Sequence, residues 1–102
     1  MSTLHTVNKS PFERSAFISA LNHLRPGDAL LMLEDGVVGA RKSGAFAGLL
    51  AGAAAGCSVY VLVPDMMARG MKAEDLAPGV ELVDYGGFVD LVAAHQKTQA
   101  WL

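Results

Sequence analysis

The chain has 102 residues, enough for one domain of ordinary size, and 52% of them are hydrophobic against 18% charged. This composition excludes an intrinsically disordered chain, and it leaves so little charged surface that we expect a partner to cover part of the apolar excess. The formal net charge is −2 and the eight Lys and Arg residues are scattered along the chain, so no basic stripe is present for direct binding of nucleic acid.

The first half of the chain predicts a strand, a helix and a second strand in turn. Residues 4–7 fit a short strand. The next helix is expected to begin at Pro11, because Ser10 and Glu13 have the spacing of a capping box and proline suits the first helical position. One face of this helix is apolar and carries Phe12, Ala16, Phe17, Ala20, Leu21 and Leu24. The continuous apolar run 29–33 then predicts a strand that is covered on both faces.

Four glycines at four-residue spacing mark the centre of the chain: Gly44, Gly48, Gly52 and Gly56. The uncharged stretch 45–63 is nearly long enough to cross a bilayer, and the glycine spacing resembles the small-residue pattern of paired membrane helices. We favour a soluble interpretation, with a helix over 45–55 and a β-branched strand over 59–63, because residues 56–58 form a break between them. No membrane contact is therefore expected.

The two inner glycines of this stretch are candidate contact positions. Gly48 and Gly52 each cost about 1 kcal/mol relative to alanine within a helix. We expect close backbone packing against the chain's own sheet to offset that cost, with contact to another chain as the alternative.

The second half of the chain continues the alternation of strands and helices. Asp65 is expected to cap a short helix that ends at Gly70, followed by a strand over 80–83 and an amphipathic helix over 88–95. The remaining tail has no clear class. Strands that alternate with helices predict a single three-layer α/β domain over residues 1–102, with a mostly parallel sheet whose strand order the pattern does not specify.

Three segments resemble the TusB/DsrH family of small subunits from bacterial sulfur-relay complexes: residues 4–14, 33–37 and 99–102. The likeness covers nearly the whole chain and is weak between residues 41 and 57. It implies the DsrE-like fold and a dimer of heterotrimers with TusC/DsrF-like and TusD/DsrE-like paralogues. In this family the TusD/DsrE-type partner carries the principal reactive cysteine and passes persulfide sulfur to a TusE/DsrC-like acceptor. The resemblance therefore implies a non-catalytic subunit, for which we expect no cofactor.

The family serves two pathways. TusB-like members take part in 2-thiolation of the wobble uridine in tRNA, and DsrH-like members in dissimilatory sulfur oxidation. The segment 7–13 (VNKSPFE) and the ending 99–102 look closer to DsrH. The chemical step, in which sulfur passes between cysteines, is similar in both pathways.

The single cysteine, Cys57, is the only possible sulfur carrier in the chain. It precedes an apolar strand and has no basic neighbour closer in sequence than Lys42 or Arg69, so nothing nearby favours the thiolate that sulfur transfer requires. We expect a small buried hydrophobe, and the alternative is a subunit that itself carries persulfide on Cys57. Some DsrH-like members have a cysteine in the first helix, where this chain has Ala20. A lone cysteine also fits the reducing cytoplasm.

Other polar residues give weaker functional signals. Glu34 and Asp35 follow the second predicted strand, at the sheet edge where open α/β sheets bind ligands. The chain lacks a phosphate loop, so we favour loop capping or partner contact over a free-standing small-ligand-binding domain. The three histidines lack metal-ligand spacing, which predicts no metal site, and His5 is expected to be a hydrogen-bonded core group. Trp101 is expected to anchor in a partner or in its own domain.

Overall fold

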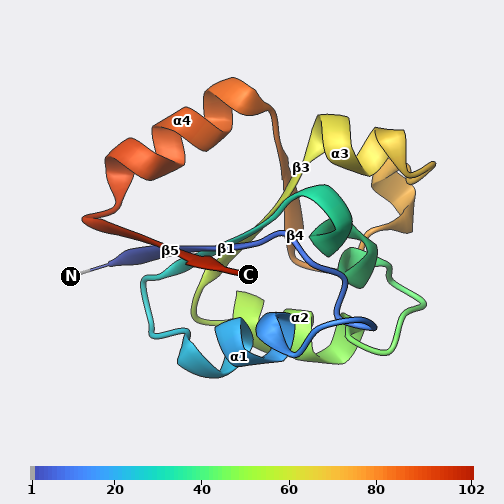
Figure 1. The fold of residues 1–102 in the computed structure, drawn as a ribbon, viewed down its shortest axis with the longest axis horizontal. Helices are drawn as coiled ribbons and strands as arrows, with labels where there is room; N and C mark the ends of the chain where they lie inside the picture. The colour runs from blue at the N-terminus through green and yellow to red at the C-terminus, as the bar shows by residue number, and fades with distance from the viewer. Residues whose placement is uncertain (1) are drawn as a thin grey trace.

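The computed structural model describes residues 2–102, which form one five-stranded sheet with helices on both faces (Figure 1). Neighbouring strands all run parallel, in the order β4-β3-β2-β1-β5. The strands are β1 (Thr3–Val7), β2 (Ala29–Met32), β3 (Ser58–Leu62), β4 (Val80–Val83) and β5 (Lys97–Trp101). The predicted three-layer α/β fold with a parallel sheet is therefore confirmed.

Four α-helices form the two outer layers of the fold. In the view of Figure 1, the helices below the sheet are α1 (Ala16–His23) and α2 (Ala47–Ala54), and those above it are α3 (Val63–Ala68) and α4 (Tyr85–Ala94). Two 3-10 segments complete the described chain, η1 (Glu34–Ala40) and η2 (Ala73–Asp75). No helix within residues 2–102 combines the length and the apolar character needed to cross a membrane.

The central strand explains where the core lies. All four residues of β2 are buried, because the strand has a neighbour on each side and helices over both faces. The larger part of the core lies between the sheet and the α1/α2 layer, and includes Val7, Phe17, Leu30, Leu50 and Val61. The cluster beneath α4 is smaller, and α4 itself contains no buried residue. The α4 side of the molecule therefore leaves more apolar surface uncovered.

Helix α1 begins at Ala16, and the predicted start at Pro11 is wrong. Ser10 closes a turn instead, since its hydroxyl accepts a hydrogen bond from the Phe12 N–H at 3.2 Å. Its carbonyl oxygen also accepts from the Glu13 N–H at 3.1 Å. A serine that bonds the backbone two residues onward offers the chain an alternative to a helix, and here that alternative prevails.

Two other helices begin earlier than predicted. The third strand ends at Leu62, and Val63 already belongs to α3, because Pro64 fits the first turn of a helix. Helix α4 begins three residues earlier than predicted. Asp84 caps it by accepting from the Gly87 N–H at 2.8 Å, which allows a glycine-containing first turn.

The tail to which the sequence assigned no class forms the edge strand β5. It pairs with β1, so that Lys97 lies opposite Thr3 and Trp101 opposite Val7. Four of its five residues are exposed, so the segment lacks the apolar alternation of a half-buried strand. Pairing between the two ends of the described chain, and not a local pattern, therefore determines this strand.

Candidate functional site

The residues that the sequence singles out lie in three separate places. Glu34 and Asp35 follow β2 at the carboxyl end of the sheet, within η1. Gly52 and Cys57 lie at the opposite end, where α2 leads into β3. Trp101 lies on the edge strand β5. These residues therefore do not form one catalytic centre.

Contacts within the chain hold η1 against α3 at the carboxyl end of the sheet. The Asp65 carboxylate accepts from the Glu34 N–H at 2.7 Å. Asp65 thus lies in the first turn of α3 and does not cap that helix, which corrects the prediction. Arg69 donates from two nitrogens to one Asp35 oxygen, at 2.8 and 3.1 Å. The side chains of Glu34 and Asp35 are exposed beyond these contacts.

The backbone of η1 is constrained at two positions. Glu34 adopts a φ of 49°, which is uncommon for a residue with a side chain. A Cβ on Gly36 would collide with the carbonyl oxygen of Val7, so only glycine fits this close approach to β1. Segment 33–37, which carries part of the family resemblance, thus has a structural reason for its glycine.

Cys57 lies half-buried between α2 and β3, and it is less buried than the sequence suggests. Its Sγ–H donates to the carbonyl oxygen of Arg25 at 3.1 Å. Burial, together with the nearby Asp28 carboxylate, raises the pKa of the Cys57 thiol above its ordinary value. The sulfur borders a groove of about 290 Å³ between α1 and α2. Because the thiol stays neutral near pH 7, it is poorly suited to nucleophilic attack.

The glycines of α2 lie on an open surface. A Cβ on Gly48 or Gly52 would meet no atom within 4 Å. The prediction that these glycines pack closely against the chain's own sheet is therefore wrong, since the residue that α2 buries is Leu50. Gly44 and Gly56 fall outside the helix.

A buried chain of polar groups joins β1, the start of β2, and β5. His5 and Asp28 are only 5% and 4% exposed. His5 Nε2 lies 3.0 Å from an Asp28 oxygen, and Trp101 Nε1 lies 3.1 Å from His5 Nδ1. Because an indole N–H can only donate, His5 Nδ1 accepts that bond, and Nε2 carries the proton that His5 donates to Asp28. The indole of Trp101 is thus anchored in its own domain.

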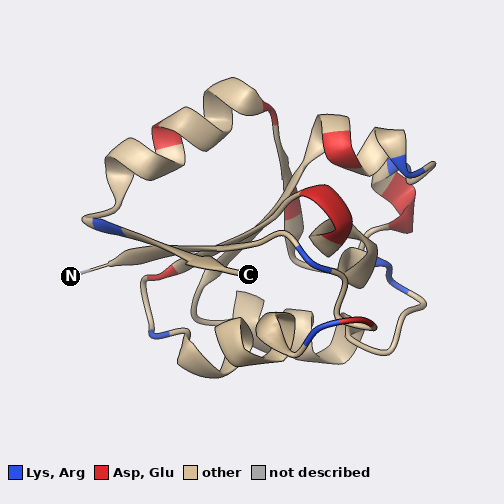
Figure 2. Cartoon of the chain, in the orientation of Figure 1, with Lys and Arg blue, Asp and Glu red and all other residues tan. Residues whose placement is uncertain are grey.

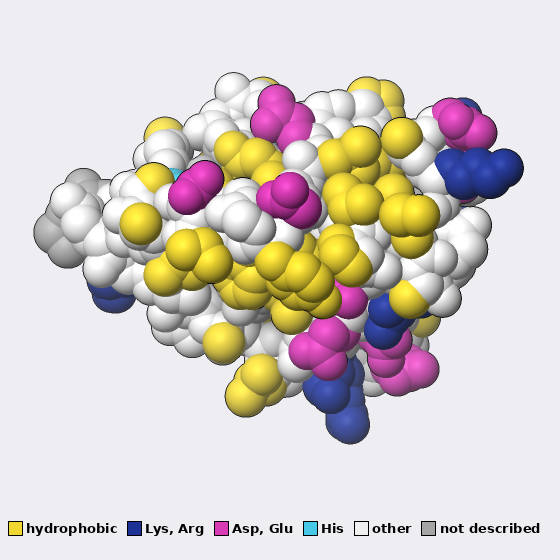
Figure 3. Space-filling model, turned by 90° about the horizontal axis from the view of Figure 1, so that it is seen from above, with side chains coloured by type: hydrophobic (Ala, Val, Ile, Leu, Met, Phe, Trp, Pro, Cys, Tyr) yellow, Lys and Arg dark blue, Asp and Glu magenta, His cyan; other side chains and the backbone are white. Residues whose placement is uncertain are grey.

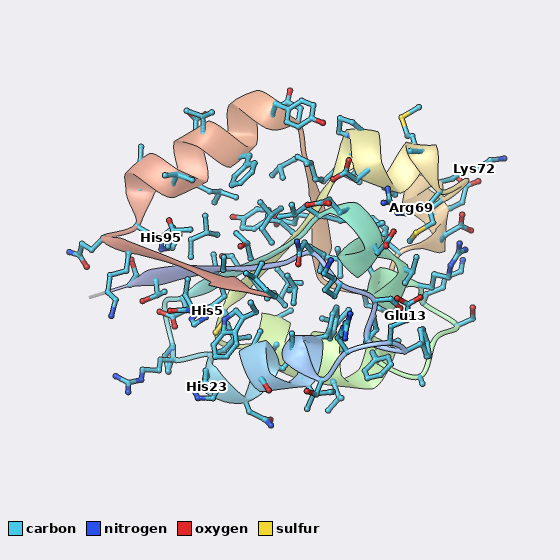
Figure 4. All side chains as sticks on the ribbon, in the orientation of Figure 1. His5, Glu13, His23, Arg69, Lys72 and His95 are labelled. Carbon is cyan, nitrogen blue, oxygen red and sulfur yellow. The ribbon has the colours of Figure 1, made fainter. Side chains whose placement is uncertain are left out.

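Asp28 is the centre of this chain of groups. It also accepts from the backbone N–H groups of Thr3 and Arg25, at 3.0 and 3.1 Å. Burial alone would raise the pKa of Asp28, but these bonds and the one from His5 hold it below its ordinary value. A pocket of about 360 Å³ opens beside the cluster, between His5 on the sheet and His23 at the end of α1 (Figure 4). Since its buried polar groups are paired within the chain, the cluster fastens β5 to the sheet.

Sequence reasoning missed the role of Asp28. A carboxylate directly before a fully buried strand is the signal that could have identified it, because such a group must find donors as it leaves water. Across residues 2–102, no three His, Cys, Asp or Glu side chains gather as a metal ion would require.

Comparisons with known proteins find relatives along nearly the whole chain. A family model described as DsrH like protein matches residues 9–98. Protein TusB of Pectobacterium parmentieri is 39% identical over 98 residues, covering 96% of this chain and 99% of the relative. Protein TusB of Escherichia coli K12 is 36% identical with the same coverage.

Solved structures show the same fold at lower sequence identity. The ychN protein of E. coli has a TM-score of 0.83 at 15% identity, covering 98% of this chain and 99% of that one. A protein of unknown function from Methanobacterium thermoautotrophicum has a TM-score of 0.73 at 17% identity, covering 94% and 96%. At these identities the likeness establishes the fold alone.

Proposed function

Because this chain belongs to the TusB/DsrH family, we propose that it is a non-catalytic subunit of a heteromeric sulfurtransferase complex. In this proposal it assembles in the cytoplasm with TusC/DsrF-like and TusD/DsrE-like paralogues. The TusD/DsrE-like subunit supplies the reactive cysteine, and a TusE/DsrC-like protein accepts the persulfide sulfur. TusB relatives that match 96% of the chain support its place in such a complex.

The state of Cys57 supports the non-catalytic part of the proposal. To carry sulfur, a cysteine thiolate attacks the outer sulfur of a donor persulfide, the donor thiolate leaves, and a new persulfide forms on the attacking cysteine. The hydrogen bond to Arg25 and the raised pKa of Cys57 both favour the neutral thiol, which is the unreactive form. This chain therefore contributes structure to the complex, and the transfer occurs on other subunits.

The decisive assay follows radiolabelled sulfur from a persulfide donor to the TusE/DsrC-like acceptor. Complexes that contain wild-type chain or Cys57→Ser are compared at equal concentration, and we expect equal transfer. A complex with serine at the reactive cysteine of the TusD/DsrE-like subunit is the negative control. An assembled Cys57→Ser complex that no longer passes sulfur would show that Cys57 itself carries persulfide.

For the pathway, we propose thiolation of the tRNA wobble uridine. The curated relatives named above are TusB proteins, and they outweigh the DsrH-like appearance of the terminal motifs. A bacterial strain without its own TusB subunit provides the test. This chain is expressed there with its two cognate paralogues, and 2-thiouridine in tRNA is measured by mass spectrometry. Restored thiolation supports the pathway, whereas an assembled complex that restores none favours sulfur oxidation.

Four exposed residues are proposed partner contacts: Glu34, Asp35, Gly48 and Gly52. The two acids lie at the carboxyl end of the sheet, and the two glycines offer an open strip of α2 to which another backbone could approach closely. Trp101 is not proposed to touch a partner. Its hydrogen bond to His5 fixes the position of β5, and it affects a partner surface only through that strand.

A further inference from the structure

Helix α4 exposes apolar side chains although its other side already packs on the sheet. Phe88 and Leu91 pack against the smaller core cluster. Tyr85, Val89 and Val92 are 59%, 67% and 43% exposed, and their spacing places them in one stripe along the helix. A helix that is apolar on all sides is normally buried. The exposed side of α4 therefore has the composition of a covered surface.

One neighbouring element extends this stripe. Met67 of α3 is 66% exposed, and α3 lies on the same side of the sheet as α4 (Figure 1). We define the α4 face as Met67, Tyr85, Val89 and Val92. Figure 3 views the molecule from this side and shows hydrophobic side chains gathered over α4 and α3. Apolar surface concentrated in this way typically marks a contact with another molecule.

The charges of the chain are segregated around this surface. Residues 73–96 contain five acids and no Lys or Arg, whereas the rest of the chain contains eight basic and five acidic residues. The five acids are Glu74, Asp75, Glu81, Asp84 and Asp90. In Figure 2, α4 and β4 carry acidic residues and no Lys or Arg. In Figure 3, acidic side chains lie beside the apolar ones, while Lys and Arg lie toward the margins of the view. The α4 face is thus apolar with an acidic border.

We propose that the α4 face binds a different subunit, whose contact surface is apolar at its centre and carries Lys or Arg at its rim. A second copy of this chain, related by a two-fold axis, would place acidic border against acidic border, and like charges across an interface oppose association. A basic rim would instead complement the border. The inference rests on the proposed function, which identifies the partner as one of the two paralogous subunits.

The substitution Val89→Asp places a charge at the centre of the α4 face. The chain is coexpressed with the tagged TusC/DsrF-like and TusD/DsrE-like subunits, and its affinity for each purified paralogue is measured. Because Val89 is two-thirds exposed, the variant should fold normally, which circular dichroism checks. We expect affinity for one paralogue to fall about 100-fold, as for the centre of an interface. Leu102→Asp is the matched control, since it adds the same charge at an exposed apolar residue outside the face and should change little.

A charge reversal tests the chemistry of the rim. The double variant Glu81→Lys and Asp90→Lys should weaken binding about 10-fold at low salt, and the difference should shrink as salt is added. Stronger binding by the double variant would show that the partner does not carry Lys or Arg at the rim of its contact surface.

The remaining outcomes separate this inference from the proposed function. If wild-type chain binds neither paralogue, the proposed function itself fails. If wild type binds and Val89→Asp binds equally well, only the α4 face is wrong. A dimer of the chain alone that Val89→Asp disrupts would make the occupant a second copy and overturn the proposed partner.

Discussion

The substitution Asp28→Asn removes a negative charge at a buried position where three donors converge. In the native protein the carboxylate accepts from the Thr3 N–H, the Arg25 N–H and the His5 Nε2–H. An amide of nearly the same volume offers one acceptor oxygen in place of two and adds an N–H₂ group that faces those donors. At least one buried donor therefore loses its partner, and the remaining bonds lose their charge.

The magnitude of this effect can be estimated from the bonds that are lost. Hydrogen bonds to charged groups contribute roughly 1.5–3 kcal/mol each, so we expect the free energy of unfolding to fall by about 2–4 kcal/mol. For a domain of this size the melting temperature should fall by roughly 10–20 °C. Thermal unfolding followed by circular dichroism measures the change, with Asp90→Asn as an exposed control that removes the same charge. Equal melting temperatures for the two variants would refute the structural role of Asp28.

The lowered pKa of Asp28 predicts that its contribution to the free energy of unfolding depends on pH. Because the pKa of Asp28 is lower in the folded state than its ordinary value of 3.8, the unfolded chain takes up the proton more readily. The stabilisation from Asp28 is therefore complete above the unfolded pKa and is lost as the pH falls through the lower, folded pKa. The difference in melting temperature between wild type and Asp28→Asn should narrow below about pH 4. A constant difference on acidification would mean that the carboxylate charge is not its source.

Five further substitutions test the glycines and the edge strand. Gly36→Ala should lower the free energy of unfolding in urea by about 3 kcal/mol, because the new Cβ meets the Val7 carbonyl oxygen. Gly52→Ala should raise it by about 0.5–1 kcal/mol, because the site is open and alanine favours the helix. Gly52→Leu should not lower the melting temperature but should block coassembly with a paralogue, whereas Ala51→Leu should permit it. Coassembly of both variants would show that Gly52 does not contact a partner. Trp101→Phe should cost about 1–2 kcal/mol in the same urea assay, since His5 Nδ1 loses its donor, and an unchanged midpoint would contradict the bond.

The parts of the fold that the sequence predicts are those determined by local patterns. The apolar run of β2 indicates a strand buried on both faces, and its place at the centre of the sheet agrees. Strand β5 has no such pattern, because four of its residues are exposed and its register comes from β1 at the other end of the chain. At Ser10 two local rules compete, and the turn that its hydroxyl closes prevails over the capping box. Local rules thus fail where a distant partner or a competing bond decides the structure.

The same division holds for the candidate functional residues. The neutral state expected for Cys57 follows from its sequence neighbourhood, but the Arg25 carbonyl that accepts its proton is distant in sequence. The expected packing of Gly48 and Gly52 assumes that a helical glycine serves its own domain, whereas the space beside both is open. His5 is predicted as a hydrogen-bonded core group, yet its partners Asp28 and Trp101 come from separate segments that only the sheet brings together.

At both ends of the sheet, the polar groups that could take part in chemistry are engaged within the chain. At the carboxyl end of the sheet, where open α/β folds place their ligands, Asp35 is paired with Arg69 and Asp65 holds the Glu34 backbone. At the other end the Cys57 thiol is protonated and hydrogen bonded. The α4 face differs from both, since its apolar side chains are largely exposed and acidic residues border it. Under the proposed function, this subunit acts by holding others in position, so its function should tolerate loss of the Cys57 thiol but not a charge on the α4 face.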